Sequence, residues 1–228
     1  MAIIGYDQVL KASGSMGGAL VVFEGQPQLL VGGFDFDRSD LPGAGVVLPC
    51  GTPVNCDEAS RKITPLITLK VKAVDGTDAK KVELVSNGFN GPALKVGDKV
   101  AIINNTLDHE YTNTPAAGAD PAVYTFVGVA EIDGFNIVLD NALDSLAANS
   151  ILVVVKENET THKAAIKAVP NALLPYDKVY DAAATIVRGD GMIGNDMPVL
   201  ERRMPPITDA IKAAVQANGH KITFSNRK

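Results

Sequence analysis

The chain of 228 residues contains no tryptophan, and aromatic residues make up only 5% of it. Hydrophobic residues still account for 46%, so one large or two small domains can bury a core of valine, isoleucine, leucine and alanine. Positive charge is also scarce, since 21 lysines and arginines against 26 aspartates and glutamates give a net charge of −5. Because proteins that bind a phosphate backbone usually have a basic face, we expect no direct nucleic-acid partner.

Long hydrophobic runs are missing too. Runs such as Ile151–Val155 have the length of a strand, whereas a membrane-spanning helix needs about 20 apolar residues, so we expect no membrane partner. The first residues, Met1–Asp7, do not combine a basic stretch with an apolar one, as a secretion signal does. We therefore expect no secretion by that route.

The sequence has two cysteines, Cys50 and Cys56, six positions apart. Two are too few for a disulfide framework in a chain of this size. We expect two reduced, partly buried thiols. A local disulfide or a redox pair is the alternative, although the spacing is not Cys-X-X-Cys.

Motifs typical of catalytic or metal sites are not found. His109, His162 and His220 lie far apart, without the cysteine or carboxylate neighbours that a metal site needs. Gly189–Gly194 has Gly-X-Gly-X-X-Gly spacing, but Pro198 would interrupt the helix that a dinucleotide site requires, so a glycine-rich loop is predicted. The sequence also lacks a nucleophile elbow and a phosphate loop. We expect no enzymatic activity, no metal and no cofactor.

Glycine, in contrast, is abundant in residues 1–45, which contain nine of them. Because glycine loses extra backbone entropy on ordering, this stretch is predicted to be an N-terminal arm that cannot pack alone. Ala19–Phe23 and Gln28–Val31, separated by turn residues, predict a hairpin within it. Two interpretations stay open: the arm orders against a neighbouring molecule, or it packs on its own body.

Residues 67–158 are predicted to form a small β-barrel or sandwich. Short apolar runs separated by turn residues are typical of such modules, and Thr68–Val74 alternates apolar with polar side chains. Tyr124–Ile132 and Phe135–Leu139 predict a hairpin. A short helix is expected over Ala142–Ala148, with Asp140 as its cap.

Residues 46–66 and 160–228 are predicted to form one split body around this module. Val46–Val54 is a short apolar strand that runs into a Pro-X-Gly-Thr-Pro corner, and Pro170–Asp177 is interpreted as its companion. A helix is predicted over Ile207–Ala217, because apolar residues recur there every four positions. The predicted fold is therefore mainly β, a β-rich α+β chain with a split body, an inserted barrel or sandwich and a C-terminal helix.

Several segments resemble those of a known family. Val46–Val54 resembles the Leu-Pro-Ala-Gly-Thr-Pro-type segment of phage head decoration and head-fibre proteins, with Cys50 where alanine is more usual. Other segments are similar to auxiliary capsid or head-fibre proteins of tailed phages, including crAss-like phages: Ala168–Asp177, Arg203–Ile207 and Ile222–Ser225. The resemblance covers roughly residues 45–66 and 165–228.

The resemblance implies a non-enzymatic virion protein on the outer capsid surface, made in the host cytoplasm. Such a protein decorates or cements the capsid by binding the major capsid protein, and it binds copies of itself as a homo-oligomer, for example a trimer. Contacts with these partners are expected at Leu48, Pro49, Thr52, Pro53, Phe34, Phe36, Arg202 and Arg203.

Two other functions stay open. The chain could be a different virion part, such as a tail, baseplate or adaptor protein. It could also be a carbohydrate-binding or hydrolytic module that uses the polar stretch 104–122, which we expect to be an exposed loop. Tyr111 is the only Phe, Tyr or Trp residue of that stretch, which counts against stacking on sugars.

Overall fold

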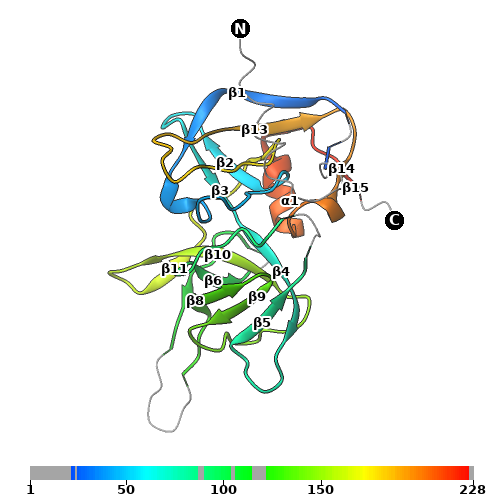
Figure 1. Cartoon of the computed structure of the whole chain (residues 1–228). Coiled ribbons are helices and arrows are strands. Elements are labelled where there is room, and N and C mark those ends of the chain that lie inside the picture. Colours follow the sequence, from blue (N-terminus) through cyan, green and yellow to red (C-terminus); the bar gives the residue numbers. More distant parts are fainter. Residues whose placement is uncertain (1–21, 24, 87–89, 104–105, 115–121, 226–228) are drawn as a thin grey trace.

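A computed structural model describes residues 22–23, 25–86, 90–103, 106–114 and 122–225 of the chain (Figure 1). The described residues are mainly β, with 41% strand and 9% helix. Its strands form two closed barrels, which lie one above the other in Figure 1. The prediction of a β-rich fold with a C-terminal helix is confirmed.

The first barrel contains strands from both ends of the chain. Its strand order is β1-β13-β12-β2-β3. These strands are β1 (Pro27–Phe36), β2 (Pro53–Asp57), β3 (Lys62–Pro65), β12 (Ala172–Leu173) and β13 (Arg188–Asn195). β1 lies antiparallel to β13 and meets β3 in parallel over a short stretch, where Asp35 pairs with Lys62. That parallel contact closes the barrel.

β13 corrects the predicted glycine-rich loop, because Gly189–Gly194 is part of this strand. The glycines mark close approaches inside the barrel rather than a turn. A Cβ atom on Gly189 would lie 2.5 Å from the Phe36 ring, and one on Gly191 would lie 2.5 Å from the sulfur of Cys56. Glycine in a strand is typical of positions where another group approaches the backbone this closely.

The proline-glycine corner pairs with the later segment, as predicted. Leu48 forms an antiparallel bridge with Lys178, and Val54 pairs with Ala172 in β12. The Gly51 N–H donates to the carbonyl of Leu174 at 2.8 Å. The two segments therefore form one continuous part of the first barrel, although more than a hundred residues separate them.

The second barrel comes from one stretch of the chain. Its order is β4-β5-β9-β8-β6-β10, and β10 also pairs with β4, which closes the ring. These strands are β4 (Thr68–Val74), β5 (Lys81–Leu84), β6 (Lys99–Ile102), β8 (Phe126–Asp133), β9 (Asn136–Leu139) and β10 (Ile151–Asn158). Two further strands, β11 (Lys163–Ala165) and β7 (Tyr111–Thr112), continue the sheet beyond β10.

Local sequence patterns explain much of this barrel. β8 and β9 form the predicted hairpin, in which Ile132 pairs with Ile137 across a turn at Gly134. The helix expected over Ala142–Ala148 is wrong, because the segment forms turns. Ser145 and Asn149, within and just after it, have φ values of 58° and 69°, which a right-handed helix does not contain.

The C-terminal part packs beside the first barrel. The predicted helix is present as α1 (Asp209–Gln216), where the Thr208 hydroxyl accepts the N–H of Ile211 as an N-cap. Ile211 and Val215 are the buried residues of α1. The remaining elements are the strands β14 (Val199–Leu200) and β15 (Phe224–Ser225) and the 3-10 turns η1 (Arg38–Asp40), η2 (Glu201–Arg203) and η3 (Ala217–Gly219).

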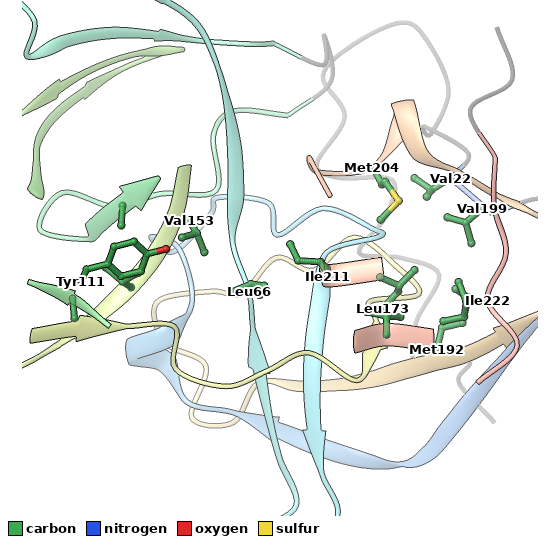
Figure 2. Close-up of a cluster of buried hydrophobic side chains, with 14 of the residues drawn as sticks. Val22, Leu66, Tyr111, Val153, Leu173, Met192, Val199, Met204, Ile211 and Ile222 are labelled. Atoms are coloured by element: carbon green, nitrogen blue, oxygen red, sulfur yellow. The ribbon is translucent and has the colours of Figure 1, made fainter. Parts of the chain in front are cut away.

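The two barrels share part of their core. One apolar cluster joins Tyr111 of β7 and Val153 of β10 to Leu173 of β12 and Ile211 of α1. Figure 2 shows Leu66 between these two groups of side chains. Leu66 is 3% exposed and belongs to the connection from β3 to β4. The barrels are therefore packed on each other and not merely tethered.

Two predicted boundaries differ from the observed topology. β11 belongs to the second sheet, so the split body does not resume until after Ala165. β1 is a barrel strand with Phe34 fully buried, so residues 27–36 pack on their own body. Of the predicted hairpin, residues 19–21 lie outside the described residues. Phe23 pairs with Val199, and Gln28–Leu30 pair with β13.

Candidate functional site

A groove with a cavity volume of about 370 Å³ lies where the two barrels meet. One wall is the proline-glycine corner, and another comes from η2 and the prolines that follow it. The second barrel contributes the start of β4, the segment after β5 and Phe135. We call this feature the inter-barrel groove. It gathers residues from five regions of the sequence.

The corner wall is held rigidly by hydrogen bonds. The Thr52 hydroxyl donates to the carbonyl of Pro49 at 2.6 Å, and the Cys50 N–H donates to the Asp177 carboxylate at 2.6 Å. Gly51 has a φ of 81°, a conformation that glycine adopts without strain. The sequence Pro-X-Gly-Thr-Pro therefore forms a fixed turn at the edge of the groove.

Cys50 is part of this turn, but its thiol is unreactive. Burial raises the pKa of the Cys50 thiol above its usual range, and the nearby Asp177 carboxylate adds to the shift. The sulfur contacts the carbonyl of Pro175 at 3.1 Å. Since the thiolate is the reactive form of cysteine, this residue is not set up as a nucleophile. Both cysteines are free thiols, as expected, Cys56 buried and Cys50 partly buried.

The opposite wall depends on Lys212 of α1. Its ammonium lies 2.9 Å from the Glu201 carboxylate and 3.5 Å from that of Asp209. Burial alone would lower the pKa of Lys212, but the hydrogen bonds and charges of Glu201 and Asp209 outweigh it and raise the pKa. Across the groove, the Thr68 hydroxyl donates to the carbonyl of Pro206 at 2.6 Å. This bond connects the second barrel directly to the η2 wall.

The groove brings together part of the predicted contact set. Leu48, Pro49, Thr52 and Arg202 all line it. Leu48 and Thr52 are each only 1% exposed, so they shape the groove from beneath and offer little contact area. Pro49 is partly exposed and Arg202 is exposed, which makes these two the accessible members.

The other predicted contacts need correction. Phe34 and Phe36 are 0% and 5% exposed because their rings fill the first barrel, where the Arg61 guanidinium covers Phe34 at 4.8 Å. Pro53 is buried in β2, and Arg203 is partly buried and is not part of the groove lining. The glycines around Phe34 and Phe36 led to the prediction of an arm, but both phenylalanines are core residues of the first barrel.

Several groove residues were not predicted. Lys70, Val85, Pro92 and Met204 lie in segments that meet only through tertiary contacts. Pro205 and Pro206 directly precede the predicted helix. The sequence contains no local pattern that would place them beside Pro49, since the groove depends on how the two barrels pack.

A second hollow, of about 430 Å³, lies on β4, β5, β8 and β9. Its lining includes Asp75, Glu83, Glu131 and Asp133 together with Lys81. Among the described residues, no group of three or more His, Cys, Asp or Glu side chains could hold a metal ion. This hollow contains none of the predicted contacts.

Tyr111, in the stretch 104–122, is 4% exposed, and its hydroxyl donates to the carbonyl of Ile102 at 3.0 Å. It is therefore a core residue and not a sugar-stacking surface. Residues 104–105 and 115–121 of that stretch lie outside the described residues. Within the described part of the chain, no helix has the length and hydrophobicity of a membrane span. Comparisons with protein families, curated proteins and solved structures find no match to the chain.

Proposed function

We propose that the chain is a structural component of a phage particle that binds the outer surface of the capsid through the major capsid protein. In this role it decorates or cements the capsid and catalyses no reaction. The proposal starts from the resemblance of its corner and later segment to those of head decoration and head-fibre proteins.

The observation that carries the proposal is the pairing of those two segments. Val46–Val54 and Ala168–Asp177 are short and simple in composition, so each alone is a weak indication. In the structure Val54 pairs with Ala172, and the Gly51 N–H donates to the carbonyl of Leu174 at 2.8 Å. Two motifs that together form one part of a barrel support a shared architecture better than two isolated matches.

The proposal assigns a role to each barrel. The first barrel, with its corner and the adjoining groove, faces the capsid protein, and the second barrel projects outward. Copies that self-associate, for example as trimers, would bind a repeated lattice at several points. Such multivalent attachment increases the overall affinity without any new type of contact.

The test is to mix the purified protein with expanded, undecorated capsids and sediment the particles. We expect saturable binding at a fixed ratio to the capsid subunits. Absence of binding at that ratio would overturn the proposal. Negative-stain microscopy of the protein alone is the second measurement, because rings or tubes would instead favour a tail, baseplate or adaptor protein.

A further inference from the structure

The inter-barrel groove is positively charged although the chain as a whole carries a net charge of −5. Its charged lining residues are Lys70, Glu201 and Arg202. Glu201 is 14% exposed and is already bound by Lys212 at 2.9 Å, so its charge is balanced. Neither Lys70 nor Arg202 forms an ion pair with another described residue. Within the described part of the chain, these two positive charges are therefore uncompensated.

Apart from these charged residues and the polar Thr52, Thr68, Ser86 and Asn90, the groove lining is apolar. Four prolines contribute to it: Pro49, Pro92, Pro205 and Pro206. Proline has no backbone N–H, so these residues offer apolar contact but no backbone donors. Val85 also lines the groove and is 45% exposed. An apolar side chain that covers this surface removes it from water, which favours binding.

The size and rigidity of the groove restrict what can bind. A volume of about 370 Å³ is near the lower end for ligand pockets, which fits a few residues of a chain and not a folded domain. Its walls are fixed by the Thr68–Pro206 and Glu201–Lys212 contacts. A preformed site of this kind loses little entropy of its own on binding.

From this charge and shape we infer that the groove binds a short apolar segment that carries a carboxylate, and that this segment belongs to the capsid protein. The second half of this statement rests on the proposed function. The apolar side chains lie against the prolines, and the carboxylate lies between Lys70 and Arg202. Complementary charge would select an acidic segment and exclude a basic one.

The first test reverses the charge of the groove. The double variant K70E/R202E should bind expanded capsids about tenfold more weakly than the wild type, because like charges then face the acidic segment. The matched control is K80E/K221E, which changes the net charge equally at two exposed lysines outside the groove lining. Equal binding by both double variants would overturn the inference while leaving the proposed function intact.

The second test identifies the occupant. A photo-crosslinking amino acid is placed at Val85, which lines the groove, and in a control at Val96, which is 62% exposed and not part of the lining. After irradiation on capsids, we expect cross-links from position 85 to an acidic, apolar peptide of the capsid protein. Cross-links from position 85 only to another copy of this chain would contradict the inference.

A third test separates the groove chemistry from the capsid. The probe is the peptide acetyl-Leu-Glu-Pro-Leu-Glu-amide, compared with its counterpart in which lysine replaces glutamate, in NMR titrations without capsids. The acidic peptide should shift the amide signals of Leu69 and Val85, which both line the groove, in the wild type and not in K70E/R202E. If the acidic peptide binds the groove while capsids do not bind the protein, the proposed function is wrong and the inferred preference of the groove for an acidic segment is supported. If both peptides behave alike, that inferred preference is wrong.

Discussion

The two barrels of this protein are built from the chain in different ways. The second barrel uses one stretch, β4 to β10, and all its ladders are antiparallel. The first uses β1 to β3 together with β12 and β13, and it closes through a parallel contact. Barrel closure therefore depends on local hairpins in one case and on distant segments in the other.

The buried side chains of the two barrels also differ. The second barrel fills its interior with aliphatic side chains such as Val71, Ile137 and Leu152, each fully buried. The first barrel contains the rings of Phe34 and Phe36, and Gly189 leaves room for the Phe36 ring because it has no side chain. Gly191 leaves room in the same way for the Cys56 sulfur and for Ala172. The buried cluster of the second barrel consists of aliphatic side chains, whereas the first barrel depends on a few close fits between side chains and glycines.

The largest loss of stability is expected from Gly191→Val, which disrupts the close fit around Gly191. An added Cβ would lie 2.5 Å from the Cys56 sulfur and 2.8 Å from the Ala172 Cβ, so the strands must move. We expect a loss of about 4 kcal/mol in the free energy of unfolding, measured by urea denaturation.

The matched control for Gly191→Val is Gly76→Ala in the second barrel. An added Cβ at Gly76 meets nothing within 4 Å and φ is not positive there, so the change should stay within about 0.5 kcal/mol. Similar losses for the two variants would remove the contrast between the barrels.

The same contrast explains how far the sequence could predict the structure. Short apolar runs separated by turn residues predicted the β8–β9 hairpin, and a four-residue repeat predicted α1. A loop was predicted where β13 forms, because its glycines are explained only by Phe36 and Cys56, which are distant in sequence.

The groove could be predicted from the sequence even less well than β13. Pro49 belongs to the predicted corner and Arg202 was among the expected contacts, but no local pattern in the sequence indicates Lys70, which also lines the groove. The groove arises from the packing of one barrel on the other, which no periodicity in a single segment records. Sequence reasoning therefore located two of its walls and missed what the second barrel contributes.

The second prediction tests whether the barrels are energetically coupled. Leu66 is 3% exposed and lies between the side chains of the two bodies in the shared cluster (Figure 2). Leu66→Ala should cost about 3 kcal/mol through lost burial and the cavity left behind. We also expect one cooperative urea transition to split into two, followed by tyrosine fluorescence and circular dichroism. A single transition at lower urea would show that the remaining contacts suffice for coupling.

The third prediction concerns the two cysteine thiols, which belong to the first barrel and its proline-glycine corner. Burial raises the pKa of Cys56 to about 12 from 9.0, with Asp190 and Glu58 adding to the shift. Above about pH 9 the unfolded chain loses this proton while the folded chain keeps it, so stability falls as pH rises. The slope is at most about 1.4 kcal/mol per pH unit for each thiol.

The measurement is urea unfolding of the wild type and Cys56→Ala between about pH 8 and pH 10. This range stays below 10.5, the ordinary pKa of lysine, above which the raised pKa of Lys212 also affects stability. Cys56→Ala should show the smaller decline, whatever its stability at pH 8. An unchanged decline would mean that the thiol is accessible to water in the folded chain.

The smallest effect compares one ion pair from each body. Lys72 and Glu83 of the second barrel are 2.6 Å apart, with side chains 61% and 41% exposed. Exposed pairs contribute little, because water and salt screen them, so Lys72→Ala should change stability by less than about 0.5 kcal/mol. Lys212 and Glu201 are 23% and 14% exposed, and Lys212→Ala leaves a carboxylate without its partner at the groove. We expect it to cost about 1 kcal/mol more than Lys72→Ala in urea unfolding at low salt, and equal losses would mean that burial does not distinguish the two pairs.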